Sequence, residues 1–189
     1  MSSHHIIRDE QEPPILVFSI HNNWKELSEL LGWSPIVFIN PPLQEIFDAL
    51  QTKIDGYLLN EDYEAKLAEN VFIYNEHNLD EVLLKWINHK KWTAINIFCN
   101  DQLMKNLFFQ LKRTRLEIPL IFFTENGKSI LKPSSKFRKW YPKKCKLEIF
   151  NDDVLKTENL VLSGKEFTVE RDGFILIEVQ GDTILVKEK

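Results

Sequence analysis

The hydrophobic positions of this chain change their period repeatedly over the first 125 residues. Short β-branched and aromatic runs alternate with stretches in which apolar residues recur every three or four positions, the spacing of one helix face. This alternation predicts a parallel sheet with helices on both faces. The expected strands are 15–20, 35–40, 55–60, 70–75, 93–100 and 118–125. The expected helices are 23–33, 41–50, 79–91 and 102–114, with a short helical turn or loop at 61–69.

The pattern changes after Glu125, where seven runs alternate apolar and polar residues between Asn-Gly, Asp-Gly and Gly-Asp turns. No helical pattern of useful length remains in this part of the sequence. We therefore expect an α/β domain at 15–125, preceded by an N-terminal tail at 1–14 and followed by a small β-sandwich domain at 126–189.

The composition is that of a folded globular protein, with 43% hydrophobic and 12% aromatic residues. Glycine is scarce, and neither a P-loop nor the G-x-G-x-x-G fingerprint occurs. No apolar run approaches the roughly 20 residues that a membrane span needs. Cys99 and Cys145 follow no disulfide or metal-ligand spacing. These features predict a cytoplasmic protein that does not associate with membranes.

The charge of the chain is unevenly distributed. The net charge of −4 argues against nucleic acid as a partner. From Lys128 to Lys146, however, there are eight lysines or arginines and no acidic residue. Such a run is commonly the solvated face of a hairpin, and the alternative is a surface that attracts phosphate or an acidic partner. Both interpretations stay open from the sequence.

One junction between an expected strand and an expected helix raises the question of a site. The segment "CNDQLMKNLFFQL" at 99–111 passes from strand to helix through Asn-Asp-Gln, without a glycine. Asn100 or Asp101 can accept hydrogen bonds from the free N–H groups of the first helical turn. Alternatively, Asp101 belongs to a ligand site at the carboxyl edge of the sheet, where right-handed crossovers bring strand ends together. Asparagines end four of the expected strands, at Asn40, Asn60, Asn75 and Asn100.

The order of the parts and several weakened motifs resemble the thiamine pyrophosphokinase family from about residue 15 to residue 187. The family's D-G-G after the second strand corresponds to "NPP", which begins at Asn40. Its P-D-x-x-x-G-D-x-D-S motif is similar to "IDGYLLNEDY", in which Asn60 replaces one aspartate and Asp62 retains another. Its D-x-T-D element is similar to "HNLD", in which Asp80 is retained.

The last shared motif lies in the segment that raised the question. The family's D-H-x-x-x-N is similar to "DQLMKN", with Asp101 and Asn106 retained and Gln102 in place of histidine. The resemblance implies a protein that binds ATP and Mg²⁺ at the carboxyl ends of the strands and transfers pyrophosphate to thiamine. It assigns catalysis and Mg²⁺ binding to Asp62, Asp80 and Asp101. It assigns nucleotide binding to Asn40, Asn60, Gln102 and Asn106.

The resemblance also implies a homodimer, and the aromatic content of the last 60 residues favours one. A small sandwich does not easily bury so much aromatic surface. The aromatic residues concerned are Phe137, Trp140, Tyr141, Phe150, Phe167 and Phe174.

The departures from the family pattern predict a weakened Mg²⁺–ATP site. Mg²⁺ prefers anionic oxygen ligands, and Asn40 and Asn60 remove two negative charges. Pro41 and Pro42 block the approach of the backbone to a phosphate and lack N–H donors.

Three functions therefore stay open: a pyrophosphokinase with a weakened site, a catalytically lapsed relative that binds a nucleotide or a thiamine compound, and a structural or partner-binding protein. A non-catalytic alternative also exists for two of the acids, with Asp80 as the cap of a helix at 81–91 and Asp62 as a turn residue.

Overall fold

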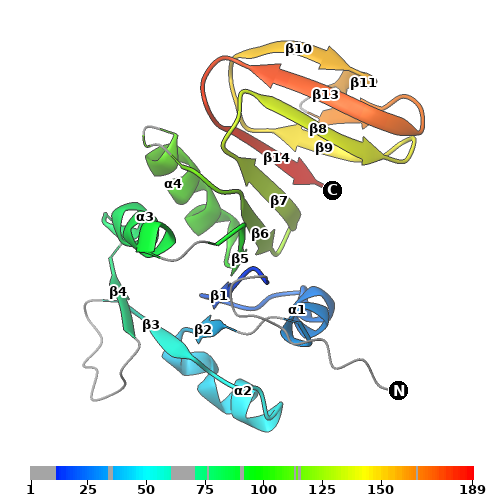
Figure 1. The fold of residues 1–189 in the computed structure, drawn as a ribbon. Coiled ribbons are helices and arrows are strands. Elements are labelled where there is room, and N and C mark those ends of the chain that lie inside the picture. The colour runs from blue at the N-terminus through cyan, green and yellow to red at the C-terminus, as the bar shows by residue number, and fades with distance from the viewer. Residues whose placement is uncertain are drawn as a thin grey trace, which may run out of the picture.

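The computed structural model describes residues 12–33, 36–60, 71–75, 77–89, 92–112, 114, 116–164 and 166–189. An eleven-stranded mixed sheet runs through these residues, and a three-stranded antiparallel sheet forms a second layer over one end of it (Figure 1). The α/β class and the all-β C-terminal part are both as predicted from the sequence.

Six strands form the parallel part of the large sheet, in the order β6-β5-β1-β2-β3-β4. Each lies within one of the six strands that the hydrophobic runs predicted, because strands buried on both faces carry nearly continuous apolar residues. Their bounds are β1 Ile15–Val17, β2 Val37–Ile39, β3 Gly56–Asn60, β4 Val71–Tyr74, β5 Ile95–Phe98 and β6 Leu120–Thr124.

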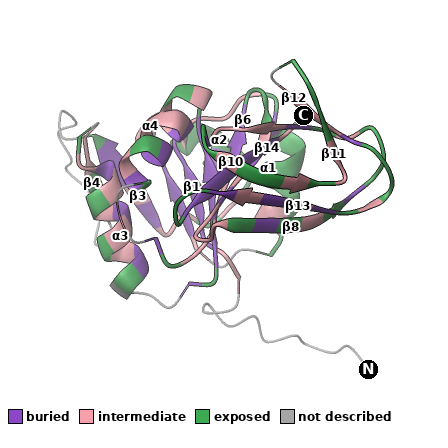
Figure 2. Cartoon of the chain, turned by 90° about the horizontal axis from the view of Figure 1, so that it is seen from above, coloured by how far each residue is buried: buried purple, intermediate pink, exposed green. Residues whose placement is uncertain are grey.

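Two clusters of buried side chains place the helices on the two faces of this parallel part. On one face, Leu83 and Phe108 pack with Leu16, whereas on the other Leu27 and Phe47 pack against the strands. The described helices are α1 Trp24–Leu31, the 3-10 turn η1 Pro41–Leu43, α2 Gln44–Ala49, α3 Leu79–His89 and α4 Asp101–Leu111. The helical turn expected at 61–69 lies outside the described residues. Figure 2 shows the buried residues concentrated in the strands and exposed residues on the outer sides of the helices.

The large sheet continues past Glu125, which differs from the expected parallel sheet followed by a separate sandwich. β6 pairs antiparallel with β7, and the order then continues β14-β9-β12-β11. This pairing satisfies the backbone groups that an edge strand at β6 would leave free. The strands concerned are β7 Gly127–Lys132, β9 Lys146–Ile149, β11 Leu160–Ser163, β12 Glu166–Val169 and β14 Ile184–Glu188.

The small sheet packs on this antiparallel extension and forms the sandwich. Its order is β10-β13-β8, with β8 Lys136–Tyr141, β10 Val154–Glu158 and β13 Gly173–Val179. The sequence pattern did not predict β10. The two sheets enclose a core that includes Phe137 and Ile177 from the small sheet and Leu147 and Val186 from the large one. Whether 15–125 and 126–189 fold as separate domains stays a prediction.

The basic run Lys128–Lys146 lies along β7, β8 and the start of β9. Acidic residues from the last part of the chain pair with several of its lysines: Lys136 with Glu178, Lys139 with Glu188, and Lys146 with Glu166. Both cysteines are free. Within the described ranges, no helix is long and apolar enough to cross a membrane.

Candidate functional site

The chain adds its parallel strands to the sheet first on one side of β1 and then on the other, so the strand order reverses between β1 and β5. From β1 it proceeds to β2, β3 and β4 on one side, and it then returns to β5 and β6 on the other side of β1. Open α/β sheets bind ligands outside the carboxyl ends of the strands at such a switch point. Here that position lies beside Phe18 and Ser19, which follow β1, and Asn100 and Asp101, which follow β5.

A pocket of about 260 Å³ opens at this edge. Three of its lining residues, Asn60, Gln102 and Asn106, are among the four positions assigned to nucleotide binding. Gln102 Nε2 donates to Asn106 Oδ1 at 2.8 Å across one turn of α4. None of the described lining residues is charged, and five of them carry amides. The lining consists of Phe18, Ser19, Asn60, Tyr74, Leu79, Asn100, Gln102, Leu103, Asn106 and Gln110.

The fourth predicted nucleotide-binding residue, Asn40, is not among the residues that line this pocket. Its Nδ2 donates to the carbonyl oxygen of Phe18 at 3.3 Å, and its backbone N–H donates to that of Val17 at 2.8 Å. Asn40 thus fastens the end of β2 to the end of β1, and its role toward a ligand stays a prediction.

Asn100 caps α4, as one of the two interpretations of this junction predicted. Its side-chain oxygen accepts from the backbone N–H of Leu103 at 2.8 Å. The neighbouring Asp101 is left to make other contacts.

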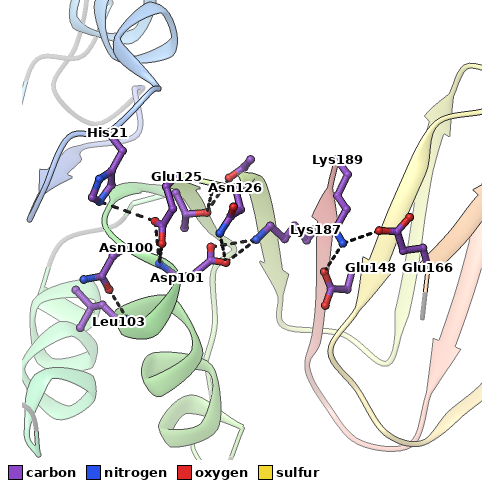
Figure 3. A network of polar contacts seen from close by, with 12 residues as sticks. His21, Asn100, Asp101, Leu103, Glu125, Asn126, Glu148, Glu166, Lys187 and Lys189 are labelled. Atoms are coloured by element: carbon purple, nitrogen blue, oxygen red, sulfur yellow. Dashed lines mark hydrogen bonds and ion pairs between the residues drawn. The ribbon is translucent and has the colours of Figure 1, made fainter. Parts of the chain in front are cut away.

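Asp101 is held in a largely buried ion pair (Figure 3). Lys187 Nζ, which comes from β14, lies 3.0 Å from Asp101 Oδ1 and 2.8 Å from Oδ2. Asn126 Nδ2 donates to Asp101 Oδ2 at 2.8 Å. Burial alone would raise the pKa of Asp101, but the polar contacts with Lys187, Thr124 and Asn126, together with the charge of Lys187, outweigh it and hold that pKa below its ordinary value. Asp101 is therefore a charged carboxylate whose oxygens already have partners.

A second carboxylate contacts the backbone at the start of α4. The N–H of Asp101 donates to Glu125 Oε2 at 3.1 Å, where the positive end of the helix dipole favours a negative charge. Glu125 Oε2 also lies 3.9 Å from His21 Nε2, which lies 3.1 Å from Ser19 Oγ. These contacts link the chain after β1 to the ends of β5 and β6 (Figure 3).

No described contact connects the other two predicted acids, Asp62 and Asp80, to this network. Asp62 lies outside the described residues. α3 begins at Leu79, so Asp80 lies in its first turn and not at its N-cap, and the capping alternative for Asp80 is wrong.

The donor set at the start of α4 differs from the ligand set that Mg²⁺ prefers. No group of three His, Cys, Asp or Glu side chains in the described ranges is placed to hold a metal ion. Mg²⁺ prefers anionic oxygens in octahedral geometry, whereas both oxygens of Asp101 are bound by Lys187. The described residues around Asp101 therefore do not fit the ion, and the metal roles of Asp62 and Asp80 stay predictions.

The roles of Lys187, Asn126 and Glu125 were not predicted from the sequence. The sequence did indicate that Lys187 is buried. Lys187 lies two residues after Leu185 in an expected strand, so both side chains point to the same face of β14, which is buried. No local pattern, however, identifies a partner that is 86 residues away.

Comparison with solved structures identifies the fold of this chain. The sequence matches no protein-family model and no curated protein. Thiamin pyrophosphokinase from Geobacillus thermodenitrificans superposes with a TM-score of 0.64 at 9% identity, covering 95% of this chain and 98% of that chain. Thiamin pyrophosphokinase from Candida albicans gives 0.59 at 12% identity, covering 94% and 89%. The yeast enzyme gives 0.58 at 13% identity, covering 97% and 88%. This chain has the fold of the thiamin pyrophosphokinases.

Proposed function

We propose that this protein is a thiamine pyrophosphokinase-like protein that binds a thiamine compound or a nucleotide in the pocket at the carboxyl edge of the parallel strands. Its transfer of pyrophosphate from ATP to thiamine is weak or lost. The observation that carries the proposal is the convergence of Asn60, Gln102 and Asn106 on one pocket beside the switch point of the sheet.

The pocket's chemistry suits a polar heterocycle. Amide side chains offer donors and acceptors together, as in the paired hydrogen bonds that Asn and Gln make with adenine. Phe18 and Tyr74 meet edge to face, with 5.3 Å between ring centroids, and give the pocket an aromatic wall. Burial raises the pKa of Tyr74, so its hydroxyl stays protonated. A volume of about 260 Å³ is smaller than the roughly 300–1,000 Å³ of sites for drug-sized ligands, so the pocket suits one heterocycle of such a ligand, with the rest of the molecule outside it.

The surroundings of Asp101 favour weak transfer over full activity. Asn60 provides a neutral amide where the family has an acid, and the Asp101 carboxylate is paired with the Lys187 ammonium. The negative charge that would hold Mg²⁺ for the phosphate groups is thus reduced at two positions, which supports the catalytically lapsed alternative.

A homodimer is part of the proposal. Of the aromatic residues that favoured it, Phe137 and Tyr141 are buried, whereas Trp140 and Phe174 are 52% and 58% exposed. Trp140 and Phe174 lie directly opposite each other on β8 and β13, on the outer face of the small sheet. Arg138 lies over the Phe174 ring at 4.6 Å. This exposed aromatic pair supports a contact with a second protein chain.

A thermal melting scan tests ligand binding. Thiamine, thiamine diphosphate, ATP and ATP with Mg²⁺ are added separately, and a ligand at 100 times its Kd stabilises the protein by about 2.7 kcal/mol. Asn106→Ala should abolish the rise in melting temperature, because it removes an amide from the pocket. Asn88→Ala is the matched control, since Asn88 is an exposed amide on α3. If no ligand raises the melting temperature, or if both variants respond alike, the proposal is wrong.

A further inference from the structure

Lys187 occupies an unusual position for a lysine. β14 lies between β7 and β9 inside the large sheet, and Lys187 is only 2% exposed. It lies across from Ser129 of β7, which is fully buried and whose hydroxyl has no hydrogen-bond partner among the described residues. The lysine stem therefore leaves the sheet through an enclosed region before the ammonium reaches the start of α4.

The Lys187 ammonium meets a carboxylate in a two-oxygen contact. Both Asp101 oxygens lie within 3.0 Å of Nζ, and the Asp101 side chain is 17% exposed. Asp101 is the carboxylate with which Lys187 forms an ion pair in the part of the chain that the structure describes. Because a buried ammonium without a counter-charge is strongly unfavourable, each member of the pair fixes the other.

We propose that Lys187 is a built-in cation that takes the position of a divalent metal ion at the start of α4, so that Asp101 serves as the counter-ion of a lysine and not as a metal ligand. This role of Lys187 does not depend on any ligand. The extension of the proposal, that ligand binding at this edge is independent of Mg²⁺, rests on the proposed function.

The contacts around the pair explain why a metal ion would not displace the lysine. A cation bound to Asp101 would leave the Lys187 ammonium buried and unpaired, and the two positive charges would repel each other. Asn126 adds a donor to the same carboxylate and contributes no negative charge. Glu125, the other acid that contacts Asp101, is already hydrogen-bonded to the Asp101 backbone.

Binding of Mn²⁺, followed by the EPR signal of the free ion, tests the proposal on the full-length protein. The wild type and Asp101→Asn should bind Mn²⁺ with affinities that agree within twofold, because Asp101 is not a ligand. Lys187→Met should bind Mn²⁺ at least tenfold more tightly than the wild type, because it frees the carboxylate. Lys187→Arg retains the positive charge and should behave as the wild type. Lys136→Met is the matched control, since it removes a lysine from an exposed ion pair with Glu178.

A tenfold or larger loss of Mn²⁺ affinity in Asp101→Asn would overturn the proposal, whether or not Lys187→Met folds. A folded Lys187→Met with wild-type affinity would overturn it as well. The ligand arm compares thiamine binding in Mg²⁺ and in EDTA, and equal affinities are expected. If thiamine and the other ligands fail to bind at all, the proposed function is wrong, while the Mn²⁺ measurements still decide the role of Lys187.

Discussion

Gly127 lies directly against the backbone of Glu188: a Cβ atom on Gly127 would lie 2.5 Å from the Glu188 carbonyl oxygen. The φ angle of Gly127 is 121°, a backbone conformation that residues with a side chain rarely adopt. Gly127 closes the turn between β6 and β7, where Thr124 and Gly127 are paired. The same turn carries Asn126, which donates to Asp101, so the glycine also positions part of the site.

We expect Gly127→Ala to lower the free energy of unfolding by more than about 2 kcal/mol, because backbone strain and the contact with Glu188 add together. Urea unfolding measures the loss. Gly164→Ala is the control, since Gly164 also has a positive φ, of 66°, but no atom of the described residues, its chain neighbours aside, lies within 4 Å of the position of its Cβ. Its loss should be about 1 kcal/mol, the cost of the left-handed backbone conformation for a residue with a Cβ. Equal losses in the two variants would show that the contact with Glu188 carries no weight.

The ion pair of Asp101 predicts a dependence of stability on pH. The pKa of Asp101 is lowered in the folded protein relative to about 3.9 in an unfolded chain. The stabilisation is therefore complete above the unfolded value and is lost as the pH falls through the folded one. Asp101→Asn should lower the free energy of unfolding by about 2 kcal/mol at pH 6, because it leaves the Lys187 charge without a counter-ion.

Urea unfolding of the wild type and Asp101→Asn between pH 6 and pH 3 checks this prediction. The difference between them should shrink as the pH falls below about 4, since the variant has no carboxyl group to protonate at this position. Parallel curves for the two proteins over this range would contradict the assignment of the pH dependence to Asp101.

Local periodicity was enough to predict the parallel part of the fold and the cap at the start of α4. The apolar runs located β1 to β6, and right-handed crossovers placed their carboxyl ends at one edge. The assignment of Asn60 and Asn106 to a nucleotide site came from the resemblance to the thiamine pyrophosphokinases, and both line the pocket at this edge. The cap at Asn100 was predictable from the local sequence, since a cap depends only on residues within the first turn.

Contacts between residues far apart in the chain were not predictable. The pairing of β7 with β14 joins the turn after β6 to the end of the chain, and this pairing brings Lys187 toward Asp101. An alternating run indicates a strand but does not identify its neighbour. The continuous sheet past Glu125 and the ion pair therefore arise from the same non-local pairing.

Dimerisation through the outer face of the small sheet is the next prediction. Light scattering at micromolar concentration should give about twice the chain mass of 22.4 kDa. Trp140→Glu should give the monomer mass, because it places a charge in the exposed aromatic pair with Phe174. Phe109→Glu is the control, since Phe109 is also exposed, at 60%, but lies on α4. A wild-type protein that scatters as a single chain would contradict the prediction.

The last prediction concerns turnover. Formation of thiamine diphosphate from thiamine and ATP with Mg²⁺ should proceed well below about 1 per second, slower than ordinary enzymes. The physical reason is the loss of negative charge at Asn60 together with the pairing of Asp101 with Lys187. Chromatographic detection of the product measures the rate, and activity that persists in Asn106→Ala would be ascribed to a contaminating enzyme.

Two substitutions that restore negative charge separate the two causes of slow turnover, the amide at Asn60 and the ion pair at Asp101. Asn60→Asp alone should leave the rate within about threefold of the wild type, because Asp101 remains paired with Lys187. Combined with Lys187→Met, it should raise the rate at least tenfold, since two carboxylates then become free at the same edge. A wild-type rate of about 1 per second or faster would show instead that neither the amide at position 60 nor the ion pair at Asp101 limits pyrophosphoryl transfer.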